Sequence, residues 1–178
     1  HIYDDAVLQI EVIRKHHFDH ETGLYRHGWD ESRQQLWADS AGQSPHAWGR
    51  AQGWFVMGLV DALDYIPESH PQREYIIDIY KESVETAIKY QDKESGLWYQ
   101  VMDKPAERGN YVESSVSCML TYAILKGIRK GYIDPDIYAG HAKKAYANIL
   151  KQFITVNKDT TINIRQCCEV GGLGGKPY

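Results

Sequence analysis

The sequence has few of the features that would set it apart from ordinary globular proteins. It has three cysteines and six prolines among 178 residues, and its net charge is −4, so basic residues are not in excess. No apolar run approaches the ~20 residues that a membrane-spanning helix needs. These absences exclude a disulfide-rich miniprotein, a collagen-like chain and a membrane span. They also make nucleic acid a poor candidate partner.

The cysteines are Cys118, Cys167 and Cys168. An odd number favours free thiols and hence a reducing compartment, although the sequence leaves the cytoplasm and the periplasm both open. The adjacent pair lacks the spacing of a zinc knuckle. The histidines at the end of the first predicted helix lack the further Cys or carboxylate ligands of a metal site, so we expect neither a metal nor a cofactor.

Hydrophobic residues make up 43% of the chain, enough to form a buried core, and along most of it they recur at spacings of three and four. Such spacing is typical of amphipathic helices. It predicts helices over residues 4–17, 45–65, 71–91 and 112–130, and a fifth that begins at Asp134-Pro135, an N-cap followed by proline. The short run 160–164 is ambiguous between strand and loop. The sequence therefore predicts an all-α fold.

A seven-residue segment occurs twice, as DHETGLY at 19–25 and as DKESGLW at 92–98. Each copy follows one predicted helix and precedes another, so the repeating unit is a helix, a Gly-Leu-aromatic turn, a loop and a helix. A chance match between common turn residues is the alternative. Open helical solenoids usually have repeats of about 34 to 47 residues, so this longer repeat favours a closed toroid.

Six such hairpins form an (α/α)6 barrel, and this chain supplies about two and a half. We therefore expect residues 1–178 to form one domain that is part of such a barrel, truncated at both ends. The loop after the first turn is the longer of the two, with 29 residues from Asp19 to Trp48 against 19 from Asp92 to Tyr111. Long loops rich in His, Trp and Asp often carry the function of a domain.

Aromatic residues are dense in and after this long loop. Trp29, Trp37, Trp48 and Trp54 fall within 26 residues. They could serve as core filler, because aromatic side chains dominate buried surface. Indole faces also stack on the apolar face of a sugar ring while neighbouring polar groups bind its hydroxyls. The loop is therefore a candidate sugar-binding platform.

Arg50 lies four residues before Trp54, which places both side chains on one face of the predicted helix. This pair suits an acidic sugar, because a guanidinium can hold a carboxylate through two parallel hydrogen bonds while the ring packs on the indole. Two alternatives stay open. Arg50 could form a salt bridge with a neighbouring acid, and His27 could be a hydrogen-bonded structural imidazole.

Six segments resemble one family of sugar hydrolases. They are YRHGWDES at 25–32, WAD at 37–39, SPHAWGRAQGW at 44–54, LVDALDYIP at 59–67, YVESS at 111–115 and VGGLGG at 170–175. Together they are similar to the unsaturated rhamnogalacturonyl hydrolases of glycoside hydrolase family 105, and the resemblance covers nearly the whole chain. The related unsaturated glucuronyl hydrolases of family 88 share a weaker version of the W-G-R-A-x-G-W block.

The resemblance implies an (α/α)6 barrel enzyme whose substrate is an unsaturated acidic disaccharide or oligosaccharide, left when a polysaccharide lyase cleaves pectin. Such enzymes remove a 4,5-unsaturated galacturonyl or glucuronyl residue from the non-reducing end. An Asp protonates C4 and activates the water that attacks C5, and the resulting hemiketal breaks down. This vinyl ether hydration differs from the two-carboxylate displacement of ordinary glycosidases, and it implies no cofactor.

Carried over residue by residue, the resemblance places His27, Arg50 and Trp54 at the substrate site. His27 lines the sugar site, Arg50 binds near the substrate carboxylate and the glycosidic bond, and Trp54 packs on the sugar. Trp29 is a fourth candidate.

The resemblance places no catalytic residue in this chain. In the family, the catalytic Asp and a second Asp near the sugar lie on segments that precede the point matching residue 1. Asp30, Asp39 and Glu113 do not match those positions. We therefore expect the isolated chain to be inactive. The alternative is a noncatalytic helical toroid that binds acidic oligosaccharides.

Overall fold

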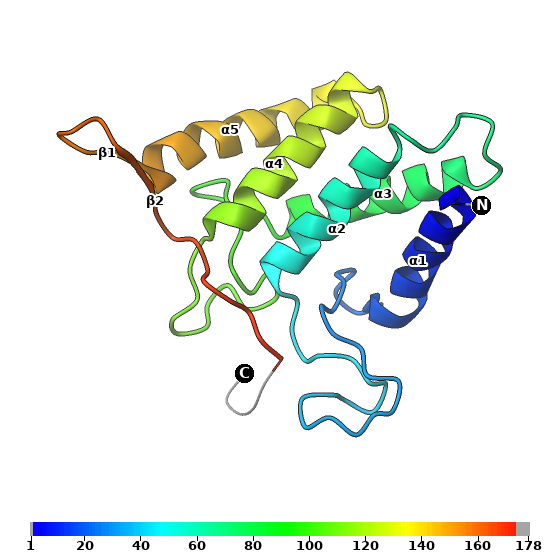
Figure 1. Cartoon of the computed structure of the whole chain (residues 1–178). Helices are drawn as coiled ribbons and strands as arrows, with labels where there is room; N and C mark the ends of the chain where they lie inside the picture. The colour runs from blue at the N-terminus through cyan, green and yellow to red at the C-terminus, as the bar shows by residue number, and fades with distance from the viewer. Residues whose placement is uncertain (1, 174–178) are drawn as a thin grey trace.

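The structure is a computed structural model that describes residues 2–173 (Figure 1). Five helices and a two-stranded sheet follow one another along this part of the chain. In chain order they are α1 (Ile2–His17), α2 (Gly49–Ala62), α3 (Arg73–Lys89), α4 (Ser114–Arg129), α5 (Pro135–Phe153), β1 (Ile154–Val156) and β2 (Ile162–Ile164). All five predicted helices are present, so the prediction of a mostly helical fold is confirmed.

Helices α2 and α4 lie side by side and begin at the same end of the molecule (Figure 1). Near their starts Arg50 of α2 bonds Ser115 of α4, and near their ends Asp61 of α2 bonds Lys126 of α4. Helix α5 packs against α4, and α3 packs against α2 and α4. The core between α2, α3 and α4 consists of apolar side chains, among them Val56, Leu59, Val60, Ile76, Ile79, Tyr80, Leu120, Ala123 and Ile124.

Helix α2 begins four residues later than the sequence predicts. Residues 45–48 are not helical: Trp48 is extended and pairs with Val101 as an antiparallel β-bridge, and the Gly49 N–H donates to the Gln100 carbonyl at 2.7 Å. A Cβ at Gly49 would lie 2.6 Å from the Tyr99 carbonyl oxygen, so glycine permits this close approach. The start of α2 is therefore anchored to the loop that precedes α4.

The two copies of the repeated heptapeptide form the same turn. In the first, the Asp19 carbonyl accepts from the Gly23 N–H at 2.8 Å, and in the second, the Asp92 carbonyl accepts from the Gly96 N–H at 2.7 Å. The two glycines have φ values of 73° and 70°, which side chains other than glycine rarely adopt. The two similar sequences therefore form the same local structure, which a chance similarity between common turn residues does not explain.

The segment 160–164, which the sequence left ambiguous, ends in the strand β2, Ile162–Ile164. β2 pairs antiparallel with β1, with Ile154 opposite Ile164. Three residues per strand are too few for an alternating pattern to stand out, so the prediction of an all-α fold missed this short hairpin.

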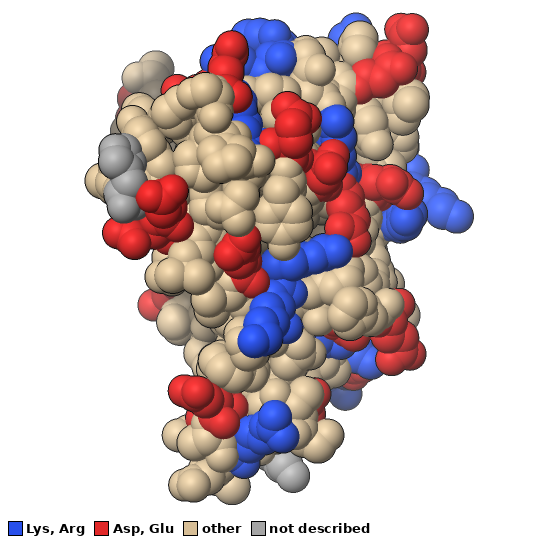
Figure 2. All heavy atoms as spheres, turned by 90° about the vertical axis from the view of Figure 1, so that its right-hand side faces the viewer, with Lys and Arg blue, Asp and Glu red and all other residues tan. Residues whose placement is uncertain are grey.

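The face on the right of Figure 1 carries charges of both signs. Figure 2 shows both acidic and basic side chains on this face, with several acidic ones gathered in its upper middle. None of the helices within the described residues is both long enough and apolar enough to cross a bilayer.

Candidate functional site

Three segments meet at the end of the molecule where α2 and α4 begin: the loop 26–48, the loop 99–113 and the C-terminal segment 165–173. The C-terminal segment descends from β2 past the starts of α4 and α2 (Figure 1). It is fixed there by main-chain bonds, because the Ser114 N–H donates to the Gln166 carbonyl at 2.9 Å and the Cys168 N–H donates to Glu113 Oε1 at 2.8 Å. Gly174 and Gly175 of the VGGLGG motif lie outside the described residues.

A predominantly apolar cavity of about 640 Å³ lies between α1 and α2 and runs from Trp48, just before α2, to Ala62 at its end. Two of the predicted substrate-binding residues, His27 and Trp54, line it together with Trp48. Trp54 is 57% exposed, so its indole is available to a ligand. The cavity walls consist of Ala6, Gln9, Ile10, Ile13, His17, Tyr25, Arg26, His27, Trp48, Ala51, Trp54, Phe55, Gly58, Leu59 and Ala62. These residues include no Asp or Glu, so none of them is a carboxylic proton donor.

His27 is half-buried at the edge of this cavity, with its ring 5.2 Å from the Trp48 ring in an edge-on arrangement. Burial lowers the pKa of His27, and the nearby His17 lowers it further. The next residue, Gly28, exchanges hydrogen bonds with Ser44, and these hold the loop in place. His27 therefore lines the cavity in an environment that favours its neutral form over its charged form.

Arg50 is bonded to protein acceptors. Its Nε donates to Ser115 Oγ at 2.8 Å, and its Nη2 donates to the Cys168 carbonyl and lies 3.4 Å from Glu113 Oε1. The guanidinium carbon lies 5.4 Å from the centre of the Trp48 ring. The salt bridge that sequence analysis left as an alternative for Arg50 is thus present. Its role in binding sugar stays a prediction.

Trp29 lies apart from the cavity, within the framework of the long loop. Its ring stacks on His16 with the ring centres 3.9 Å apart, and its Nε1 donates to the Ala41 carbonyl at 3.2 Å. It also pairs with Gln43 through a β-bridge. Its suggested contact with substrate therefore stays a prediction, and its observed contacts are those of a loop-fixing residue.

The two acids of the long loop organise its turns. Asp30 accepts hydrogen bonds from the N–H groups of residues 32, 34 and 35, and Asp39 accepts from those of residues 41 and 43. The bonds from Gln35 and Ser32 are the main cause of a lowered pKa at Asp30. A carboxyl that must donate a proton near neutral pH needs the opposite shift.

Sequence analysis did not assign a site role to Trp48 or Glu113. Trp48 lines the cavity and lies beside both His27 and Arg50. Its position as the first residue of the W-G-R-A-x-G-W block is the sequence feature that could have identified it. Glu113 is the buried partner of Arg50, and nothing in the local sequence pairs residues 63 positions apart. Within residues 2–173, His, Cys, Asp and Glu side chains form no group of three that could hold a metal.

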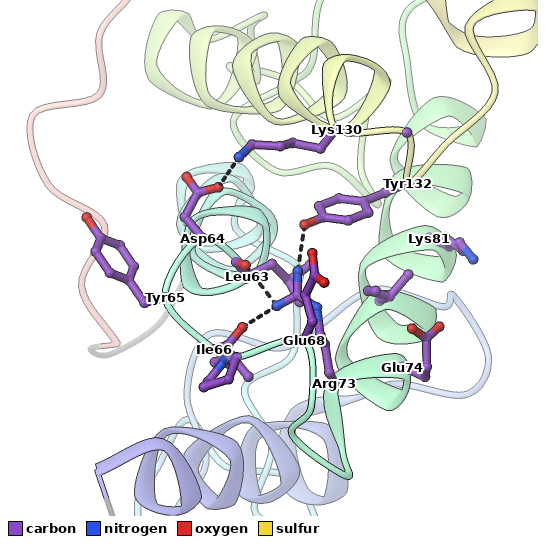
Figure 3. A pocket seen from close by; sticks show the side chains of 13 residues that line it. Leu63, Asp64, Tyr65, Ile66, Glu68, Arg73, Glu74, Lys81, Lys130 and Tyr132 are labelled. Atoms are coloured by element: carbon purple, nitrogen blue, oxygen red, sulfur yellow. Dashed lines mark hydrogen bonds and ion pairs between the residues drawn. The ribbon is translucent and has the colours of Figure 1, made fainter.

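A larger cavity, of about 780 Å³, lies at the opposite end of α2 (Figure 3). Its side chains bond to one another: Arg73 donates to the Tyr132 hydroxyl at 2.9 Å, and Lys130 pairs with Asp64 at 2.7 Å. Hydrogen bonds from Lys126 and Lys130 lower the pKa of Asp64 to about 2. This end of the helices is therefore held by ion pairs, and the residues that line it include none of the predicted substrate-binding residues His27, Trp29, Arg50 and Trp54.

The chain matches known sugar hydrolases over its whole length. The model of Glycosyl Hydrolase Family 88 matches residues 1–178. A family 105 glycoside hydrolase of C. acetobutylicum superposes with a TM-score of 0.92 at 42% identity, over 98% of this chain and 48% of that one.

Two curated relatives are also similar. Protein Atu3128 of Agrobacterium fabrum is 36% identical over 157 residues, which are 86% of this chain and 66% of that protein. The unsaturated rhamnogalacturonyl hydrolase YesR of Bacillus subtilis is 30% identical over 148 residues, which are 83% of this chain and 38% of that protein. The chain thus spans about half the length of the solved relative and less than two thirds of either curated one.

These matches confirm the resemblance to families 105 and 88 and the helical-hairpin architecture of their (α/α)6 barrels. The chain belongs to Glycosyl Hydrolase Family 88.

Proposed function

We propose that this chain is the substrate-binding part of an unsaturated glycuronyl hydrolase. The complete enzyme removes 4,5-unsaturated galacturonyl or glucuronyl residues from the non-reducing end of lyase-generated pectin oligosaccharides. It does so by hydrating the C4=C5 double bond of the vinyl ether. The proton donor is an Asp supplied by polypeptide outside residues 1–178.

One observation carries this proposal. The chain belongs to a glycoside hydrolase family, and its cavity along α2 is lined by an exposed indole and an imidazole but by no acid among the described residues. The similarity to the rhamnogalacturonyl hydrolase YesR supports the pectin-derived substrate. The 48% coverage of the solved relative supports a donor located elsewhere in the barrel.

The side chains divide the binding task between them. The exposed indole of Trp54 stacks on the apolar face of the unsaturated ring, as aromatic platforms do for sugars. Neutral His27 offers an N–H or a lone pair to a hydroxyl without attracting a proton at pH 7. Arg50 supplies a charged hydrogen bond near the glycosidic oxygen, which is the bond that the reaction releases.

The test uses an unsaturated galacturonyl-rhamnose disaccharide and follows the ultraviolet absorbance of its double bond. The chain is measured alone and joined in one polypeptide to the part of the C. acetobutylicum relative that it does not cover. We expect the absorbance to fall only with the joined protein. Turnover by the chain alone would show that an acid within residues 1–178 donates the proton.

The noncatalytic alternative predicts a different result. A sugar-binding toroid would bind the disaccharide in the folded, joined protein without any loss of absorbance. Calorimetric titration of the same samples separates binding from turnover. If the joined protein folds cooperatively but neither binds the disaccharide nor turns it over, both proposals are contradicted.

A further inference from the structure

The carboxylate of Glu113 connects three separate segments at the start of α4. The residue is 1% exposed and occupies the N-cap position of α4. Its Oε2 accepts from the Val116 N–H at 2.9 Å and from Ser115 Oγ at 2.7 Å. Its Oε1 accepts from the Cys168 N–H at 2.8 Å and lies 3.4 Å from Arg50 Nη2. One buried side chain thus joins α4, α2 and the C-terminal segment.

Glu113 is an anion in this setting. Burial by itself would raise its pKa, but hydrogen bonds from the N–H groups of Val116 and Cys168 and from Ser115 outweigh burial and lower the pKa below its ordinary value of 4.5. A buried carboxylate is stable only with such donors and an opposite charge nearby. The guanidinium of Arg50 provides that charge, so the pair is neutral overall.

The contacts of Arg50 leave one of its nitrogens for a ligand. Nε is bonded to Ser115, and Nη2 faces the Cys168 carbonyl, Glu113 and, at 3.6 Å, Cys167 Sγ. The side chain is 18% exposed, and Nη1 has no partner within residues 2–173. A carboxylate fork needs two neighbouring nitrogens of the guanidinium. Only Nη1 of Arg50 is available, and Glu113 already balances the charge of the guanidinium. Such a nitrogen suits a single uncharged oxygen of the ligand better than a carboxylate.

We propose that Glu113 is a positioning residue that fixes the Arg50 guanidinium and fastens the C-terminal segment across the starts of α2 and α4. Held in this way, Arg50 directs Nη1 to a hydroxyl or glycosidic oxygen of the sugar rather than to its carboxylate. The assignment of the sugar oxygen rests on the proposed function. The role of Glu113 toward Arg50 and Cys168 does not.

The simpler alternative is that Glu113 only caps α4, and two substitutions separate these roles. Glu113→Asp keeps a good N-cap but withdraws the carboxylate by one methylene from Arg50 and Cys168. Glu113→Gln keeps the length and removes the charge. Asp134→Ala is the matched control, because Asp134 caps α5 through the Asp136 N–H, far along the chain from this site.

The first readout is the reactivity of the Cys168 thiol, which is 5% exposed. The full chain carries Cys118→Ser and Cys167→Ser, so that Cys168 is its only thiol, and an aromatic disulfide reagent measures its rate of modification. Loss of a charged hydrogen bond weakens local closure, so we expect both Glu113 variants to react about tenfold faster or more. The Asp134 control should react at the parent rate.

The second readout is the Nε–H resonance of Arg50 in a nitrogen-15 spectrum. We expect a signal protected from solvent exchange in the parent chain and in Asp134→Ala, and loss of protection in both Glu113 variants. If folded Glu113→Asp keeps the protected Arg50 signal and the Cys168 modification rate of the parent chain, Glu113 serves only as the N-cap of α4. That result would overturn the proposal.

The third readout tests the sugar oxygen. The unsaturated disaccharide and its uronate methyl ester are titrated into the parent chain and into Arg50→Lys. If Nη1 binds an uncharged oxygen, the substitution weakens both ligands by the same factor. A larger loss for the free acid would assign Arg50 to the carboxylate. Absence of binding to both the parent chain and the joined protein would overturn the proposed function and the sugar assignment, while the first two readouts still decide the role of Glu113.

Discussion

Arg26 and Asp103, which are 77 positions apart, form an ion pair with Nη1 and Oδ2 separated by 3.0 Å. Arg26 also pairs with Asp19 at 2.5 Å, and Asp103 accepts from the Ala47 N–H at 2.9 Å. The three charged side chains are largely buried. This network joins the first repeated turn, the end of the long loop and the loop of the second repeat, so it sets where His27 and Trp48 stand.

Removing the acid of this pair should destabilise the fold. Asp103→Ala leaves Arg26 with one partner fewer and the Ala47 N–H without its acceptor, and breaking a buried pair in this way costs roughly 3 kcal/mol. Denaturant unfolding measures the loss. Asp78→Ala is the control, because Asp78 is exposed and lies 3.9 Å from Lys81, so its removal should change stability by less than about 0.5 kcal/mol. Equal effects of the two substitutions would contradict a structural role for Asp103.

Two helical glycines should respond in opposite directions to the same substitution. The Tyr80 hydroxyl, which donates to the Ala123 carbonyl at 2.8 Å, occupies the space that a Cβ would need at Gly127. Gly127→Ala should therefore destabilise the chain by about 1–3 kcal/mol through overpacking. A Cβ at Gly140 meets nothing within 4 Å, so Gly140→Ala should stabilise α5 by roughly 0.5–1 kcal/mol. Melting temperatures that shift in the same direction would contradict this packing.

The helices were predictable because each has a wide apolar face. In α4, the buried Val116, Leu120, Ala123 and Ile124 repeat at helical spacing, and packing against α2 and α3 reinforces what the local pattern favours. The start of α2 was not predictable from periodicity. Residues 45–48 continue the apolar pattern, but Trp48 is extended where it pairs with Val101, and the helix begins only after it.

That His27 and Trp54 lie close together could be expected from shared motifs, although their role at a substrate site stays a prediction. His27 and Trp54 belong to segments that resemble the family, and both line the same cavity. Partners that join distant segments were not predictable: Glu113 and Cys168 are 63 and 118 positions from Arg50. A salt bridge of this kind depends on the tertiary arrangement of α2, α4 and the C-terminal segment, and no local spacing encodes it.

His27 should titrate below the ordinary imidazole value. Burial and the neighbouring His17 disfavour its charged form, so its pKa in the folded chain lies below 6.5. Between pH 6.5 and the lowered folded-state pKa, the unfolded chain therefore binds more protons than the folded chain. The stability from neutral His27 is therefore complete above pH 6.5 and is lost as the pH falls through the folded-state pKa. Proton NMR titration of the His27 ring checks this, and a midpoint at or above 6.5 would refute it.

Glu113, like His27, should make the folded chain less stable as the pH falls. Its folded-state pKa is below 4.5, because hydrogen bonds outweigh the effect of burial, so its contribution is complete above pH 4.5 and is lost as the pH falls through the lowered value. Stability plotted against pH should therefore fall less steeply below pH 4.5 in Glu113→Gln than in the parent chain. Parallel curves in this range would mean that Glu113 has an ordinary pKa in the folded state.

Trp54 should matter for sugar binding and little for stability. Its side chain is 57% exposed, so Trp54→Ala removes little buried surface, and its melting temperature should stay close to that of the parent chain. Loss of an aromatic stacking partner costs roughly 1 kcal/mol, so the Kd of the unsaturated disaccharide should rise about fivefold. Tyr65→Ala is the matched control, because Tyr65 is 75% exposed and lines the cavity at the opposite end of α2. It should leave the Kd unchanged. If both substitutions weaken binding equally, or if Trp54→Ala leaves the Kd unchanged in a folded chain, the indole is not the sugar platform.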